Sequence, residues 1–184
     1  GKEADIVGWS STDGNSNSHA VLWRDGKMVD LTPNSAASSR AFDVNDLGMI
    51  AGETVSADKG PTPHVWIYEN GKISTLNLFS KIPKREADPT MSGSAHAINN
   101  EGIVVGEMRL KDRLFAFVWD LKVGIKNLES LVPESDPTIP ERSWDLTVAR
   151  SINSCGQIVG WGTNRKSGNP SSFLLKPLQN KPGC

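Results

Sequence analysis

The sequence repeats itself at an interval of 54 residues, and this feature constrains the fold more than any other. The stretch AFDVNDLGMIAGE starts at Ala41, AHAINNEGIVVGE starts at Ala95 and ARSINSCGQIVGW starts at Ala149. A period of this size indicates an array in which one supersecondary unit stacks on the next. Weaker matches divide the whole chain, 1–184, into four units of a single domain, at about 1–40, 41–94, 95–148 and 149–184.

Each unit is predicted to form four short antiparallel strands, because its β-branched and aromatic residues occur in short runs separated by turn residues. In the third unit we expect strands at about 95–98, 102–109, 114–120 and 124–129. Such a unit is typical of a β-propeller blade. We therefore predict an all-β, β-propeller-like array of about four blade units. The first unit lacks its first strand and the last unit lacks its fourth, which gives 3 + 4 + 4 + 3 strands.

Two kinds of turn are predicted inside a unit. The I-N-x-x-G motif around Asn99 follows the first strand, where the Asn side chain can bond the backbone two residues on and the Gly supplies a positive φ. We call this the repeat turn. The D-G-K at Asp25 and the N-G-K at Asn70 predict tight hairpins between the third and fourth strands.

These motifs resemble the HAF repeat family, bacterial proteins described as probable extracellular repeats. The matching residues are A-x-x-I-N-x-x-G-x-I/V-V-G in the first two strands, and H-A-V-L-W followed by G-K-M-V-D-L in the last two. The resemblance implies an extracellular or periplasmic location, whereas its motifs are specific to the repeat and say little about activity. The His-Ala-Phe tripeptide itself is altered in every unit, for example to His19-Ala20-Val21.

Composition excludes several classes of protein. A formal charge of −1 at pH 7 gives no electrostatic footprint for nucleic acid. The sequence contains no run of about 18 apolar residues, so it predicts no membrane-spanning helix.

The two cysteines, Cys155 and Cys184, leave two alternatives: a disulfide that folds the C-terminal tail back onto the last repeat turn, or two unpaired thiols.

Metal sites are not favoured by the pattern. His19, His64 and His96 lie in separate units, whereas metal ligands need to cluster. The alternative is a calcium ion bound by one of two Asx-rich turns, although neither turn contains the closing Glu of an EF-hand. Their oxygen-bearing residues are Asp43, Asn45 and Asp46 in one turn, and Asp13, Asn15 and Asn17 in the other. We therefore expect no cofactor, with calcium as the alternative.

Catalysis also has little support. Glu53 and Glu107 occupy equivalent positions, and the other two units have Trp9 and Trp161 there. Two carboxylates are what a glycosidase requires, and acids beside indoles also suit a sugar-binding site. The same alternation is equally compatible with a packing position. Most other aromatic residues recur between units and are expected to fill the space between blades, namely Trp23, Tyr68 and Trp119, and Trp66, Phe117 and Phe173.

In a propeller the first strands line a central channel and the repeat turns surround one mouth of it. The candidate ligand-binding residues are therefore Asp43, Asn45, His96, Asn99, Arg150 and Asn153, together with the non-recurring Trp144 in a Pro-rich loop. The leading hypothesis is a non-catalytic extracellular module that binds a protein or a glycan, and the alternative is a secreted carbohydrate-active enzyme. The incomplete units at both ends indicate half of a larger ring, completed by a second copy or by residues outside this sequence, since open strand edges invite pairing with other chains.

Overall fold

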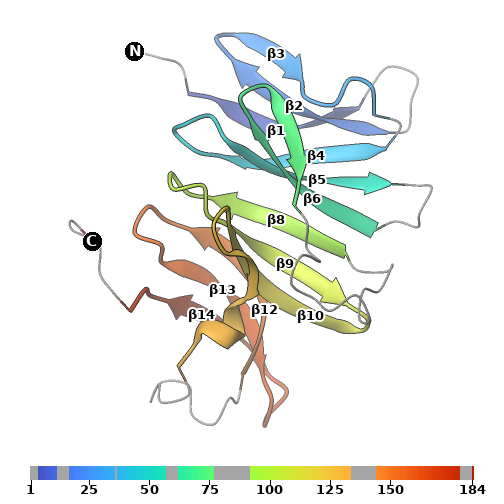
Figure 1. The fold of residues 1–184 in the computed structure, drawn as a ribbon. Helices are drawn as coiled ribbons and strands as arrows, with labels where there is room; N and C mark the ends of the chain where they lie inside the picture. Colours follow the sequence, from blue (N-terminus) through green and yellow to red (C-terminus); the bar gives the residue numbers. More distant parts are fainter. Residues whose placement is uncertain are drawn as a thin grey trace.

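The computed structural model describes residues 4–11, 17–35, 37–56, 62–76, 92–133, 144–178 and 184. These residues form four small antiparallel sheets, which we name A to D in chain order (Figure 1). Sheet A contains β1 (Ile6–Ser11), β2 (Ser18–Arg24) and β3 (Lys27–Asp30). Sheet B contains β4 (Ser38–Val44), β5 (Ile50–Ser56), β6 (Thr62–Glu69) and β7 (Lys72–Thr75).

Sheet C contains β8 (Ser92–Ile98), β9 (Val104–Leu110), β10 (Arg113–Asp120) and β11 (Gly124–Asn127), followed by the 3-10 helix η1 (Leu128–Leu131). Sheet D contains β12 (Trp144–Ile152), β13 (Ile158–Asn164) and β14 (Pro170–Leu175). Strands that are consecutive in the chain are neighbours in each sheet. The all-β prediction and the count of 3 + 4 + 4 + 3 strands are therefore confirmed in the described part of the chain. The Pro-rich stretch before Trp144, and Asp13 and Asn15 of one expected calcium turn, lie outside it.

The repeat turns have the predicted chemistry. The Asn99 side-chain oxygen accepts hydrogen bonds from the backbone N–H groups of Glu101 and Ile103, at 3.1 and 3.0 Å. Gly102 closes the turn with a φ of +74°, a conformation that glycine adopts at little cost. The D-G and N-G hairpins are also confirmed, since both central residues of each have positive φ.

The hydrophobic core consists of three clusters, and each lies between consecutive sheets. Ala20 and Leu22 of sheet A pack on Trp66 of sheet B. A second cluster joins sheets B and C around Phe117, and a third joins sheets C and D. The sheets thus stack face to face in chain order, which Figure 1 shows from the blue sheet at one end to the red sheet at the other. No cluster of described residues joins sheet A to sheet D.

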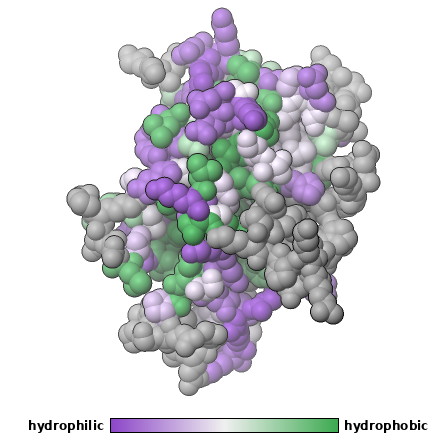
Figure 2. Space-filling model, viewed as in Figure 1, coloured by the Kyte–Doolittle hydropathy of each residue, from purple (hydrophilic) through white to green (hydrophobic). Residues whose placement is uncertain are grey.

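The two end sheets therefore each leave one face without a packing partner among the described residues. Trp66 and Phe117 are buried as expected, but Trp23, which should pack between blades, is 46% exposed. The reason is its position on the face of sheet A that points away from sheet B. On the side of the molecule shown in Figure 2, hydrophobic residues form small patches between hydrophilic ones. None of the described segments is a helix capable of crossing a membrane.

A disulfide joins Cys155 in the last repeat turn to Cys184 at the end of the chain, with a Cα–Cα distance of 5.7 Å. The structure thus adopts the bridged alternative for these two cysteines. The bridge closes a segment in which the two residues are 29 positions apart. It connects the C-terminal tail to the same end of the sheets as the other repeat turns.

Candidate functional site

The first strands of sheets B, C and D each contain a β-bulge at the same repeat position. The pairing register shifts between Ala41 and Asp43, between Ala95 and Ala97, and between Ala149 and Ser151. The residues left without a cross-strand partner are Phe42, His96 and Arg150, which we call the bulge row. A bulge redirects a side chain out of the regular alternation and is common beside binding sites.

The bulge row is continuous across the sheets. The rings of Phe42 and His96 are 6.2 Å apart and nearly perpendicular. Arg150 Nη1 lies 3.1 Å from His96 Nδ1. At the other end, the Trp9 ring of sheet A lies 6.0 Å from Phe42. One line of contacts therefore runs from β1 through β4 and β8 to β12.

The contacts of His96 determine which ring nitrogen carries its proton. A guanidinium group only donates, so His96 Nδ1 must accept from Arg150 in this arrangement. The proton of the neutral ring is then on Nε2, which faces Glu107 Oε2 at 3.5 Å. Nε2 is buried and makes no hydrogen bond of good geometry. The His96 ring thus links a cation and a carboxylate within the row.

A second group of charges lies beside Trp9. The Arg40 guanidinium carbon is 5.6 Å from the centre of the Trp9 ring, a distance suited to a cation–π contact. Arg40 Nη1 also lies 3.5 Å from Glu53 Oε1. The Arg40 side chain is 45% exposed, whereas that of Glu53 is only 6% exposed. The solvent therefore meets the cation and the indole, and the carboxylate lies behind them.

Three predicted site residues serve the repeat turns. Asn45 Nδ2 donates to the Asn99 carbonyl oxygen at 2.9 Å, and Asn99 Nδ2 donates to the Asn153 carbonyl oxygen at 3.3 Å. Each side-chain oxygen meanwhile accepts backbone N–H groups of its own turn. The turns are thus connected in a ladder across sheets B, C and D. Asn153, the last member, directs its Nδ2 to Gln157 Oε1 of its own turn.

Of the remaining predicted residues, the structure brings only two into contact with each other. His96 and Arg150 are in contact in the bulge row. Asp43 instead accepts a hydrogen bond from the Ile98 backbone N–H at 2.8 Å, which couples sheet B to sheet C. Trp144 packs in the core between sheets C and D, at the end of β12 remote from its repeat turn.

Phe42, Arg40 and Trp9 were not among the predicted ligand-binding residues. The signal for Phe42 was present, because the interval of 54 residues that relates His96 to Arg150 also relates Phe42 to His96. It was missed because Asp43, the neighbouring residue, has the more obviously polar side chain. Trp9 had been noted only in the alternation of Glu and Trp between units, Arg40 carries no motif, and the packing of sheet A on sheet B brings the two together.

No group of three or more His, Cys, Asp or Glu side chains suitable for a metal ion occurs among the described residues. In the turn that resembles a calcium loop, the Asn45 side-chain oxygen is occupied by the N–H groups of Leu47 and Met49. His19 bonds Asp30 through Nδ1 at 2.7 Å, within its own sheet.

Over residues 9–173 the chain matches a family model described as "Protein of unknown function (DUF3466)". No curated protein matches the chain. The HAF repeat resemblance is therefore wrong. It rested on I-N-x-x-G and G-K, and these motifs encode hairpin geometry, namely an Asn that bonds its own turn and a Gly at positive φ. Any repeat built from such hairpins requires Asn and Gly at these positions, so the motifs do not distinguish one family from another.

Proposed function

The chain belongs to the DUF3466 family, whose function is unknown, and from its geometry we propose that it is a non-catalytic binding module for an acidic glycan. The observation that carries the proposal is the bulge row with Trp9, an aromatic and cationic strip that crosses all four sheets. The proposal includes a propeller-like arrangement with the first strands innermost. The face-to-face packing of consecutive sheets supports that arrangement.

The chemistry of the strip favours a sugar with negative charge. Trp9 is 53% exposed, so part of its indole is available to stack on the C–H face of a sugar ring. Arg40 and the exposed Arg150 present guanidinium groups, which bind carboxylate or sulfate through two parallel hydrogen bonds. Arg40 is 45% exposed and Glu53 only 6%, so the cation is the group of this pair that an entering ligand would contact.

The carboxylates of the site are committed to basic neighbours, which supports binding over hydrolysis. Glu53 faces Arg40 and Glu107 faces His96, each at 3.5 Å. A glycosidase would need one of the two as a proton donor and the other as a base or nucleophile across the scissile bond.

The test is a glycan array with purified protein, followed by titration of the best ligand. We expect uronate- or sulfate-bearing glycans to bind, with affinity reduced at least tenfold by Trp9→Ala. Leu121→Ala is the control, because Leu121 is an exposed hydrophobic residue in the β10–β11 turn, outside the strip and outside both end faces. Binding of a protein but of no glycan would refute the ligand class, and turnover of a bound glycan would refute the non-catalytic role.

We propose an extracellular or periplasmic location. The disulfide between Cys155 and Cys184 supports it, since such bridges persist in oxidising compartments.

We also propose that a second copy packs on the two end faces, sheet D of one copy on sheet A of the other. Ile6 in sheet A is 62% exposed, while its counterparts Ile50, Val104 and Ile158, each facing the preceding sheet, are 0–7% exposed. On the opposite end face, Val159, Trp161 and Leu174 are 44–54% exposed. Inside the chain, sheets A and B, B and C, and C and D each pack the same face of the later sheet on the opposite face of the earlier one. The contact between sheet D of one copy and sheet A of the other would be a further contact of this head-to-tail kind.

Two copies would supply eight sheets, within the usual range of about four to eight blades for a propeller. Light scattering should then give twice the monomer mass for the wild type and the monomer mass for Trp161→Lys. Leu121→Lys is the control, because Leu121 is exposed in the β10–β11 turn and not on an end face. A wild-type monomer at high concentration would exclude this arrangement.

A further inference from the structure

The contact between His96 and Arg150 can exist only while the His96 ring is neutral. Arg150 Nη1 lies 3.1 Å from His96 Nδ1, and a guanidinium group donates hydrogen bonds but accepts none. A proton on Nδ1 turns this acceptor into a second donor, so the two side chains then face each other as cations that share no hydrogen bond. We propose that His96 and Arg150 form a proton-dependent oxyanion site, in which a carboxylate or sulfate group of the ligand binds between them when His96 is charged.

The inference rests on the proposed function in one respect, because the site lies within the strip that we assign to an acidic glycan. It adds that the acidic group of the glycan is recognised by these two side chains, and that recognition depends on pH. Histidine is the side chain whose charge ordinarily changes between about pH 5 and pH 8.

Glu107 provides the counter-charge for a charged His96 ring. The His96 side chain is only 10% exposed, and its Nε2 is buried without a hydrogen-bond partner of good geometry. The nearest acceptor is Glu107 Oε2, at 3.5 Å. A cationic ring is attracted to this carboxylate, which directs its Nε2–H to Glu107 and leaves its Nδ1–H for the ligand. The acceptor that Nδ1–H needs is therefore the oxyanion.

The other charged residues on the strands around His96 have different contacts. They are Arg40, Asp43 and Glu53 of sheet B, Arg109 of sheet C, and Asp145 of sheet D. Arg40 pairs with Glu53, and Asp43 accepts the Ile98 backbone N–H. Asp145 bonds Arg113 and Arg165, and Arg109 lines a cavity of about 210 Å³ together with Glu107. From β4 the ring of His96 meets the uncharged Phe42.

An oxyanion satisfies both donors of the site. Arg150 is exposed, and its guanidinium group has five N–H donors, so it can bind a ligand without leaving its strand position. One oxygen of a carboxylate or sulfate accepts from His96 Nδ1 while another accepts from Arg150. Both hydrogen bonds join opposite charges, and such bonds are about twice as strong as those between neutral groups. The site therefore selects an acidic group over a sugar hydroxyl.

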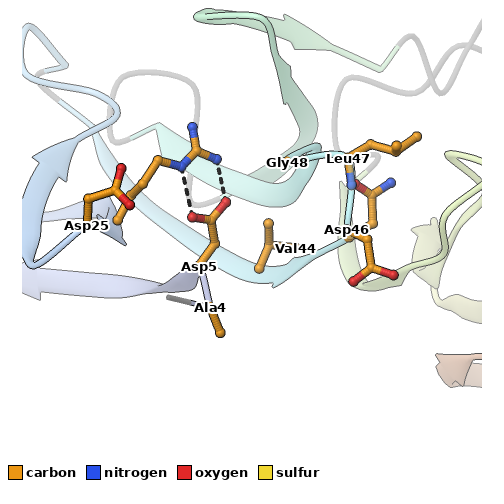
Figure 3. A pocket seen from close by; sticks show the side chains of 9 residues that line it. Ala4, Asp5, Asp25, Val44, Asp46, Leu47 and Gly48 are labelled. Carbon is orange, nitrogen blue, oxygen red and sulfur yellow. Dashed lines mark hydrogen bonds and ion pairs between the residues drawn. The ribbon is translucent and has the colours of Figure 1, made fainter. Parts of the chain in front are cut away.

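The cavity beside the repeat turn of sheet B has the opposite chemistry. It measures about 520 Å³, and the carboxylates of Asp5, Asp25 and Asp46 lie on its walls (Figure 3). Its guanidinium group, that of Arg24, donates two hydrogen bonds to Asp5, which are the dashed lines in Figure 3. These carboxylates repel an oxyanion, and the charge of Arg24 is already balanced. The bulge row is therefore the better place for the anion.

The probe is inorganic sulfate, added to the whole chain at constant ionic strength maintained with chloride. We expect saturable shifts in the NMR signals of the His96 ring and the Arg150 guanidinium group. The affinity should be at least about tenfold higher at about pH 5.5 than at about pH 8, because only the charged ring donates from Nδ1. Calorimetry in buffers of different ionisation enthalpy should show that sulfate binding takes up protons, since binding and protonation favour each other.

The repeat itself supplies matched variants of His96. The same bulge position carries Phe42 in sheet B and Arg150 in sheet D, so the framework accommodates both residue types there. His96→Phe should bind sulfate weakly at both pH values. His96→Arg, which keeps a permanent cation, should bind at about pH 8 as tightly as the wild type does at about pH 5.5. His64→Gln is the control, because it removes a histidine of β6 outside the row and should leave the pH dependence unchanged.

Three results would each overturn the inference: equal sulfate affinity of the wild type at the two pH values, shifts only at other residues, or an unchanged pH dependence in His96→Phe. The outcomes also separate this site from the glycan proposal. Sulfate binding that depends on pH, without binding of any glycan, would refute the proposed function and leave the oxyanion site. Binding of both sulfate and an acidic glycan independently of pH would refute the proton dependence and leave the proposed function.

Discussion

Gly106→Ala and Gly8→Ala form a matched pair that tests how the first strands are held. Gly106 follows Val105 on β9, and Gly8 follows Val7 at the equivalent repeat position on β1. In sheet C a Cβ would lie 2.0 Å from the Ser94 oxygen and 2.9 Å from the Phe117 ring. In sheet A it would meet no atom within 4 Å. The same substitution is therefore expected to have opposite effects.

The size of each effect follows from the geometry. A carbon–oxygen contact is ordinarily about 3.3 Å or longer, so β8 must move by roughly 1 Å in Gly106→Ala. That movement weakens one or two ladder hydrogen bonds worth about 1 kcal/mol each and strains the core by about 1–3 kcal/mol. The loss of unfolded-state entropy returns about 0.4–1 kcal/mol in either variant. The net expectation is a destabilisation of about 2–3 kcal/mol for Gly106→Ala and a stabilisation below about 1 kcal/mol for Gly8→Ala.

Thermal unfolding followed by tryptophan fluorescence measures both variants. At about 2–4 °C per kcal/mol for a chain of this size, Gly106→Ala should lower the melting temperature by about 5–10 °C. Gly8→Ala should leave it unchanged or raise it by about 1–3 °C. Equal losses in the two variants, or no loss in Gly106→Ala, would refute the argument that first-strand carbonyls require these glycines.

Three further predictions concern polar and covalent contacts. Asn99→Ala should lower the free energy of unfolding by about 2–3 kcal/mol, because it leaves buried backbone groups without partners. Asn153→Ala should cost less, because Asn153 is exposed. Urea unfolding compares the two variants. Hydrogen bonds from Arg165 hold the pKa of Asp145 below its ordinary value, so their stabilisation is present above about pH 4 and lost as the pH falls through the lowered pKa. Arg165→Met should therefore cost about 0.5–1 kcal/mol at pH 7 and progressively less as the pH falls through the lowered pKa, whereas a deficit unchanged by pH would contradict the pairing. Cys184→Ser should cost up to about 3–4 kcal/mol on the chain-entropy model, and two alkylated cysteines in unreduced wild-type protein would show that no bridge had formed.

The strand content and the repeat turns could be predicted because both depend on local sequence. The expected strands of the third unit agree with β8 to β11 except at their ends: β8 begins three residues earlier than expected, and Leu128 and Glu129, expected in the last strand, belong to the 3-10 helix η1. Within the repeat turn, the Asn99 side-chain oxygen bonds backbone groups no more than four residues away, and Gly102 contributes its own positive φ. For such features the sequence contains both partners of the interaction.

The contacts between sheets could not be predicted in this way. The Asn ladder, the bond from the Ile98 N–H to Asp43 and the stacking of Arg40 on Trp9 all join different units. Their partners follow from how the sheets are placed against each other. The sequence therefore predicted that Asn99 belongs to a turn, but not that its side chain also supports the next one.

The bulges explain where the repeats are free to differ. Positions with a fixed structural role keep one residue type in sheets B, C and D, as the turn residues Asn45, Asn99 and Asn153 do. A bulge residue has no cross-strand partner, so strand pairing does not determine its side chain. At this position the same framework carries a phenyl ring, an imidazole and a guanidinium. Since strand pairing does not require these differences, the bulge row is where the proposed ligand specificity would arise.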